Sequence, residues 1–191
     1  FAYRSHTWRE LNLLSCYLTE QYRQDDEDFL SLLTAIRSGV VEELHYERLM
    51  ERSGPELDVP DTAPRLYTHN ADVDRINANE LQKLSGAVRS YRMQAKGKDS
   101  LIEALIRGCL SPEVLELKEG AAVMFTKNSP QGTFVNGTLG TIVGWGAEGM
   151  PLVKTKDEKV VTAEPMEWQI EEDGKVRASI SQVPLRLAYA M

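Results

Sequence analysis

Arg23 is the first residue whose type and position suggest chemistry on a phosphate group. It follows the stretch Leu18-Thr19-Glu20-Gln21-Tyr22, directly after an apolar run over residues 13–18. That run predicts a buried strand, and ligands of α/β sheets lie at strand ends. An arginine there can offer a planar set of donors to phosphate oxygens. The alternative is an ion pair with the acidic residues at 25–28.

A second candidate group is Thr68, His69 and Asn70. The sequence predicts a strand over 65–68 and a helix with Asn70 as its side-chain cap and Asp72 in its first turn. Free backbone N–H groups at such a junction bind anions, including nucleic-acid phosphates. The same pattern also fits an ordinary helix cap.

A third group follows the predicted strand 121–125. Lys127 and Asn128 stand at the end of this strand, and Asn136 begins the turn Asn136-Gly137 before the next strand. Side chains of these types at a strand end can contact phosphates, although they are also common in plain loops.

Familiar catalytic patterns are absent from the sequence. It has no Walker-type phosphate loop, no G-x-S-x-G turn and no His or Cys cluster with metal spacing, so we expect no metal site. Cys16 and Cys109 lie in apolar surroundings and are expected to be buried free thiols of a reducing compartment. The chain is therefore not expected to be an enzyme by itself.

The negative charge of the chain is confined to one segment. The 191 residues carry a net charge of −7, and residues 25–58, with ten acidic and three basic residues, account for all of it. Residues 83–98 hold five basic residues and no acid. The negative net charge therefore does not exclude a polyanionic partner such as a nucleic acid. No apolar stretch is long enough for a membrane span, so no membrane partner is expected.

Periodicity predicts an α/β fold that changes character near Gly120. Helices are expected from the acidic residues 25–28 to Ser38-Gly39, over 41–51, from Asn70 onward and over 99–108. After Gly120 six short strands are expected, over 121–125, 138–143, 152–154, 160–162, 166–170 and 176–180. Asn136-Gly137 and Asp173-Gly174 predict hairpin turns. A small closed barrel is the economical arrangement, and the run 185–189 is expected to return to the first sheet.

Taken in order, these stretches resemble a known family. Leu18–Gln24 is similar to motif IV of superfamily-one helicases, and Tyr67–Asn77 to the following motif on the DNA track. The pattern L-x-L-K-x-G-x-x-V-M-x-x-K-N with V-N-G-T-x-G, within residues 112–140, resembles the RecD-like and PIF-type 5′-to-3′ DNA helicases. Val183–Met191 looks like the strand that leads into motif V.

The resemblance implies an incomplete RecA-like second motor domain over 1–118, an inserted Src-homology-3-like β-barrel over 119–182 and a return strand over 183–191. It implies that Arg23 is an arginine finger, with Gln21 also near the nucleotide. It places Thr68, His69, Asn70, Lys127, Asn128 and Asn136 near single-stranded DNA.

The first RecA-like domain, which in the family holds ATP and Mg²⁺, is expected elsewhere in a longer parent protein, because its motifs are missing here. The parent would be an intracellular helicase, cytoplasmic and nucleoid-associated if bacterial. A different hypothesis stays open: a non-catalytic adaptor, degenerate or relaxase-associated, that uses the barrel to bind DNA or a protein. Flanking sequence with a phosphate loop would favour the motor.

Overall fold

We describe a computed structural model of the chain, covering residues 1–20, 22, 25–54 and 64–191. The chain divides into two compact units, Phe1–Asp58 and Val59–Met191, which are described separately below.

The first unit is helical in its described part. Its elements are η1 (Ala2–Arg4), α1 (His6–Glu10), α2 (Glu27–Ser38) and α3 (Glu43–Glu51). The start and end of α2 confirm the sequence-based expectation, because Asp26 accepts a hydrogen bond from the backbone N–H of Phe29 at 2.9 Å and Gly39 ends the helix with φ of 74°.

The strand predicted over residues 13–18 is wrong. This segment has no regular structure, and Leu14 and Leu18 are exposed. A strand requires a hydrogen-bonded neighbour, and the described residues of the first unit contain no other strand that could pair with it.

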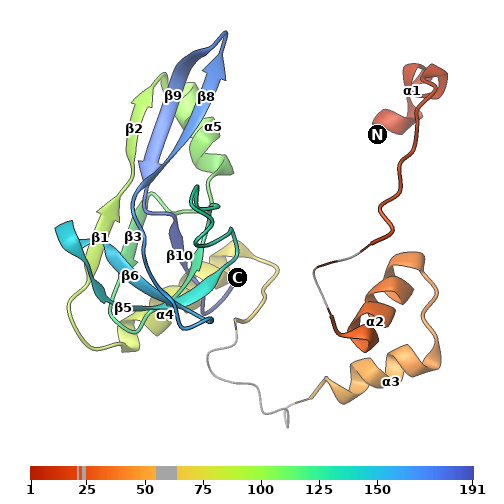
Figure 1. Ribbon diagram of the computed structural model, residues 1–191, viewed down its shortest axis with the longest axis horizontal. Helices are drawn as coiled ribbons and strands as arrows, with labels where there is room; N and C mark the ends of the chain where they lie inside the picture. Colours follow the sequence, from red (N-terminus) through yellow and green to blue (C-terminus); the bar gives the residue numbers. More distant parts are fainter. Residues whose placement is uncertain (21, 23–24, 55–63) are drawn as a thin grey trace. The chain divides into compact units, whose positions relative to one another are not determined.

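The described residues of the second unit form two longer helices and ten strands. Figure 1 shows their arrangement. In chain order the described elements are α4 (Asn70–Lys83), β1 (Arg89–Arg92), β2 (Gln94–Gly97), α5 (Asp99–Gly108), β3 (Val114–Leu117), β4 (Ala122–Phe125), β5 (Leu139–Trp145), η2 (Ala147–Gly149), β6 (Pro151–Thr155), β7 (Val160–Thr162), β8 (Met166–Glu172), β9 (Lys175–Gln182) and β10 (Leu185–Leu187).

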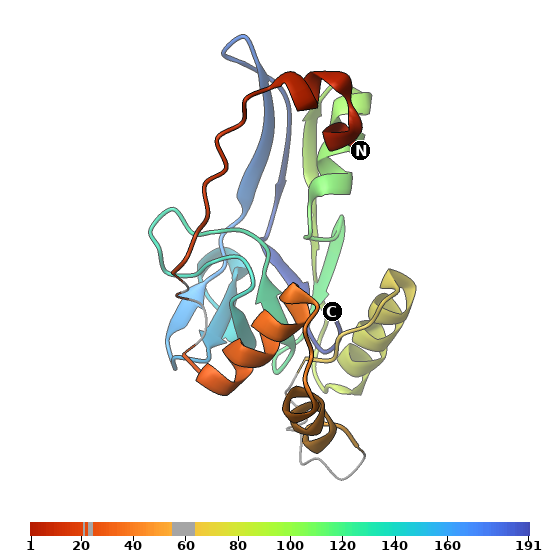
Figure 2. The ribbon, with the colours of Figure 1, turned by 90° about the vertical axis from the view of Figure 1, so that its right-hand side faces the viewer.

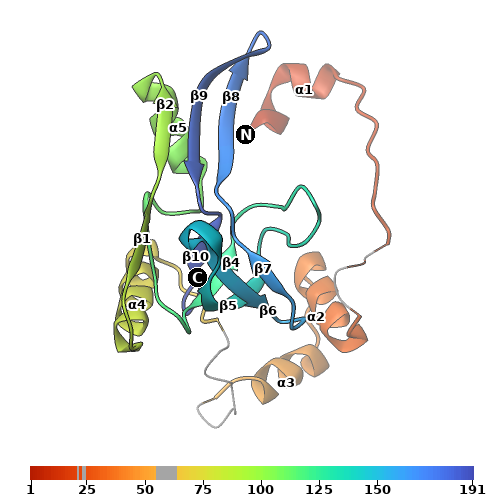
Figure 3. The ribbon, with the colours of Figure 1, turned by 60° about the vertical axis from the view of Figure 1, so that its left-hand side comes forward.

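The strands form three antiparallel sheets. One pairs β1 with β3, a second has the order β10-β4-β5-β6-β7, and a third has the order β2-β9-β8. In Figure 3 the hairpin of β8 and β9 extends away from the five-stranded sheet, with β2 and α5 on the other side of β9. Asp173 and Gly174 at its tip have φ of 53° and 70°, which confirms the predicted turn.

The six strands expected to close into one barrel are divided between two sheets. Four of them, β4 to β7, join β10 in the five-stranded sheet, whereas β8 and β9 pair with β2. The strand β2 lies in the basic stretch 83–98, where no strand was expected. It pairs with β9, so the β8–β9 hairpin belongs to the sheet of β2 and not to the five-stranded sheet. The boundaries 119–182 and 183–191 stay a prediction.

The five-stranded sheet and the β1–β3 pair surround the main core of this unit. Buried side chains from β3, β4, β5, β6, β10 and α4 meet there, and α4 contributes Leu81. Phe125, which is completely buried, stacks on Phe134 with 3.8 Å between ring centroids. This packing fixes the loop that connects β4 to β5 on the core.

The C-terminal segment lies beside α4 (Figure 2). β10 pairs with β4, and beyond it Ala190 bridges to Arg65 in parallel orientation. The expected return of residues 185–189 to the first sheet is therefore wrong for β10 itself, which extends the sheet of β4. The parallel contact with residues 65–67 begins only at Tyr189.

Among the residues that the structure describes, no helix is both long enough and apolar enough to span a bilayer.

Candidate nucleic-acid interface

Thr68, His69 and Asn70 lie where a short parallel strand pair gives way to a long helix. The backbone N–H of Arg65 donates to the carbonyl of Tyr189 at 3.1 Å, and that of Tyr67 donates to the carbonyl of Met191 at 2.7 Å. The three residues follow directly and are exposed. They thus occupy the carboxyl end of a parallel-paired segment, the position at which α/β proteins bind ligands.

The predicted cap at Asn70 is wrong, because α4 begins one residue earlier than expected. His69 is the cap residue, its carbonyl accepts from the N–H groups of Asp72 and Val73, and its side chain makes no capping hydrogen bond. The His69 imidazole instead lies 2.9 Å from the Thr68 hydroxyl. The first turn of α4 is therefore open to an outside hydrogen-bond acceptor.

Lys127 already has partners within the protein. Its ammonium group donates to the backbone carbonyl of Glu167 and lies 4.6 Å from the centroid of the Trp168 ring. These contacts hold the loop after β4 against β8. Neither partner is a carboxylate, so the positive charge of Lys127 is not neutralised by an ion pair there.

Asn128 and Asn136 come together across the same loop. The side-chain oxygen of Asn128 accepts a hydrogen bond from the backbone N–H of Asn136 at 2.7 Å, and both residues are exposed. The loop from β4 to β5 is thus closed by a side-chain contact at its base and by the Phe125–Phe134 stack beneath it.

A buried amide that the sequence analysis did not single out lies between these regions. Asn77 on α4 is 5% exposed and makes hydrogen bonds to Leu187, Tyr189 and Ala190. A signal for it exists in the sequence: position 77 is four residues from both Val73 and Leu81, on the apolar face of the helix.

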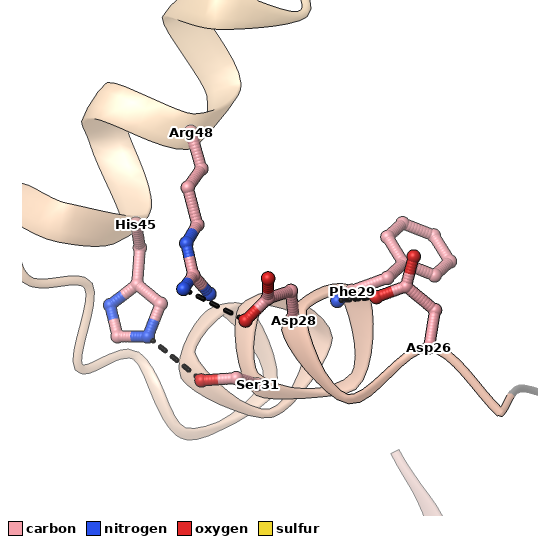
Figure 4. Close-up of polar contacts among 6 residues, drawn as sticks. All are labelled: Asp26, Asp28, Phe29, Ser31, His45 and Arg48. Carbon is pink, nitrogen blue, oxygen red and sulfur yellow. Dashed lines mark hydrogen bonds and ion pairs between the residues drawn. The ribbon is translucent and has the colours of Figure 1, made fainter.

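Arg23 and Gln21 lie outside the described residues. The acidic residues that follow them have partners of their own in the α2–α3 hairpin (Figure 4). Asp26 caps α2, and Asp28 forms an ion pair with Arg48 at 2.8 Å. Two of the four carboxylates at 25–28 are therefore engaged independently of Arg23. The pairing of Arg23 with this acidic group stays untested.

The α2–α3 hairpin also has a histidine contact between its helices. The His45 ring nitrogen Nε2 lies 3.3 Å from the Ser31 hydroxyl (Figure 4). The other ring nitrogen, Nδ1, accepts from the Glu42 N–H at 3.2 Å. His45 thus links α2 to the start of α3.

Neither a metal cluster nor a disulfide occurs in the described ranges. No group of three or more His, Cys, Asp or Glu residues converges there. Both cysteines are free, but the expected burial of Cys16 is wrong, since this residue lies in the exposed segment before α2. Cys109 is half-buried, and burial raises the pKa of its thiol.

Helicases of one group are similar to this chain. The family model described as "DNA helicase Pif1, 2B domain" matches residues 100–145. The ATP-dependent DNA helicase PIF1 of Danio rerio is 35% identical over 197 residues, which cover 100% of this chain and 30% of that protein. The resemblance to the PIF-type helicases is confirmed.

Solved Pif1 structures agree with the fold. The Pif1 helicase of Candida albicans is 30% identical with a TM-score of 0.67, over 100% of this chain and 50% of that one. Unliganded Pif1 from Bacteroides sp is 24% identical with a TM-score of 0.75, over 90% and 41% respectively. The chain thus spans at most half the length of these Pif1 proteins. The mixed helix-and-sheet fold is shared, and the 2B match covers α5 to β5.

Proposed function

We propose that the chain is part of an ATP-dependent DNA helicase and forms a section of its second motor domain. The observation that carries this proposal is the match of the whole chain to helicases named as ATP-dependent. Bacteroides Pif1 structures bound to single-stranded DNA, one of them also holding ADP-AlF3, support the same conclusion.

In this proposal two groups at the protein surface contact the backbone of single-stranded DNA. Thr68, His69 and Asn70 offer hydroxyl, imidazole and backbone N–H groups at the open first turn of α4. Lys127, with Asn128 and Asn136 beside it, offers an ammonium group that donates to a backbone carbonyl. Contacts of both kinds position a strand without reading its sequence.

Arg23 acts in this proposal as an arginine finger toward ATP held by another domain, with Gln21 close by. Its guanidinium stabilises the charge that develops on the transferring phosphoryl group. The described residues of this chain offer no cluster of Mg²⁺ ligands, so we assign the metal no ligand here. The five-stranded sheet, which contains four of the six strands of the expected barrel, supports the DNA-facing loop.

The test is Arg23→Ala in the longer helicase that contains this chain, assayed for DNA-stimulated ATP hydrolysis. Loss of an arginine finger lowers kcat by about 10³-fold or more, with binding of ATP largely retained. Arg23→Lys is expected to recover little, because a lysine lacks the planar fork. Arg37→Ala, at the exposed end of α2, is the matched control and keeps wild-type turnover.

Near-normal hydrolysis by the Arg23→Ala protein contradicts the motor role assigned to this residue. The alternative, an adaptor that binds DNA or protein without using ATP, is favoured instead if the unsubstituted longer protein binds DNA or protein but hydrolyses no ATP. Circular dichroism of each variant separates a loss of chemistry from a loss of folding.

A further inference from the structure

We propose that Asn77 is a positioning residue that fixes the two DNA-contacting groups relative to each other. The inference rests on the proposed function, since it takes Thr68–Asn70 and the Lys127 loop as the two groups. It concerns a residue that touches neither DNA nor nucleotide and acts through the C-terminal segment 187–190.

The Asn77 amide uses its full hydrogen-bonding capacity on that segment. Its side-chain oxygen accepts from the backbone N–H groups of Tyr189 at 3.0 Å and Ala190 at 2.9 Å. Its side-chain nitrogen donates to the carbonyls of Ala190 at 3.0 Å and Leu187 at 3.4 Å. Only an amide combines two acceptor sites with two donors in this way.

The segment held by Asn77 connects both groups. Toward the first group, Tyr189 and Met191 accept hydrogen bonds from Arg65 and Tyr67, the residues just before Thr68. Asn77 lies on α4, whose first turn carries that group, so the helix and the strand pair are joined at two points.

Toward the second group, the same segment continues from β10. Leu185 of β10 pairs with Phe125, the last residue of β4, two positions before Lys127. The N–H of Thr126 also donates to the carbonyl of Pro184 at 2.9 Å. One strand of chain, residues 184–191, thus contacts the base of each DNA-contacting group, and Asn77 anchors it in the middle.

Burial explains why a substitution of Asn77 would change the positions of the two DNA-contacting groups, although this residue contacts neither. Ala190, which supplies two of the four backbone partners of the amide, is completely buried, so water cannot replace the amide at these two groups. Without Asn77 the segment must shift to satisfy them, and the two groups that it connects must shift relative to each other.

The chain offers a matched control in Gln182, a second buried amide. It is 2% exposed, donates to the carbonyls of Pro112 and Glu113 and accepts from the N–H of Val183. It also donates to the carbonyl of Tyr91, and none of its partners lies in segment 187–190. Asn77→Asp and Gln182→Glu therefore remove the same donor group and add the same charge at comparable burial.

The experiment measures binding of this chain to a fluorescent oligothymidylate as a function of salt concentration. Removal of one phosphate contact reduces the slope of log K against log[salt] by about 0.7. Asn77→Asp is expected to raise Kd and reduce the slope, whereas Gln182→Glu keeps the wild-type slope. Asn77→Ser and Gln182→Ser form a second, uncharged pair that serves if an acidic variant does not fold.

If Asn77 has only a structural role, both Asn77→Asp and Gln182→Glu lower the thermal stability and neither changes the slope of log K against log[salt]. That result overturns the inference. Equal slope reductions in the Asn77 and Gln182 variants overturn it as well. Lys127→Met tests the proposed function separately. If it reduces the slope and Asn77→Asp does not, only the inference fails. If neither changes the slope, the DNA interface itself is wrong.

Discussion

Substitution of Lys127 distinguishes a loop anchor from a phosphate contact. In the structure its ammonium group lies 4.6 Å from the Trp168 centroid and donates to the Glu167 carbonyl. At a partly exposed site a cation–π contact contributes about 0.5–1 kcal/mol. A hydrogen bond adds about 0.5–1 kcal/mol more. Lys127→Met should therefore destabilise the protein by about 1–2 kcal/mol, or roughly 3–6 °C in Tm for a unit of this size.

The matched variant is Trp168→Leu, which removes the ring and leaves the charge. Both variants lower Tm, but only Lys127→Met removes a cation that a phosphate can bind. In anisotropy titrations with single-stranded DNA at several salt concentrations, we expect Lys127→Met to reduce the slope of log K against log[salt] by about 0.7. Trp168→Leu should keep that slope.

Two results would refute this reasoning. An unchanged slope for Lys127→Met would show that the residue only anchors the loop to β8. A slope reduction of the same size for Trp168→Leu would show that loss of the loop anchorage alone removes a phosphate contact, so the effect of Lys127→Met could not be assigned to its charge.

Two further predictions concern groups in or near the core. The Tyr189 hydroxyl is buried without a hydrogen-bond partner among the described residues, so Tyr189→Phe should raise the free energy of unfolding in urea by up to about 1 kcal/mol. Burial also raises the pKa of Tyr189. As the pH rises above the unfolded pKa of about 10, the unfolded state loses the hydroxyl proton before the folded state does. The free energy of unfolding therefore falls until the pH passes the folded pKa, and Tyr189→Phe should reduce this alkaline unfolding. Burial likewise raises the pKa of Cys109, so iodoacetamide at about pH 8 should label exposed Cys16 first, and urea should abolish the difference; equal rates in the folded protein would contradict it.

Elements with local signals could be predicted from the sequence. The acidic start at residues 25–28 and the Gly39 stop predicted α2, and the hairpin turn at Asp173-Gly174 was predicted because both residues need positive φ. The helix α5 was predicted with its bounds, Asp99–Gly108. In each case neighbouring residues determine the conformation, so no distant partner had to be known.

Elements that depend on distant partners were predicted poorly. The strands β1 and β2 lie in a basic stretch without alternating polarity, and they form because β3 and β9 offer edges to pair with. The division of the expected barrel into two sheets has the same cause. Residues 13–18 show the reverse, a strand-like sequence without a neighbour in the described part of its unit.

The candidate site was predicted in its residues but not in its connections. Thr68 to Asn70 and Lys127 were singled out by type and position, yet the contacts of Lys127 with Trp168 come from a residue 41 positions further along the chain. Asn77 was missed because its place on the apolar helix face, four residues from Val73 and Leu81, indicates burial but not which groups it would bind. Its partners, more than a hundred residues away, become visible only in the fold.

The parallel contact between residues 65–67 and 189–191 has an evolutionary consequence. The whole segment from α4 to β10 is inserted between residues 65–67 and residues 189–191, which lie side by side. An inserted segment of this kind can gain or lose residues, for example at the tip of the β8–β9 hairpin, without moving either of the two paired strands. We therefore expect related proteins to differ in the length of the inserted segment while the pairing of residues 65–67 with 189–191 is kept.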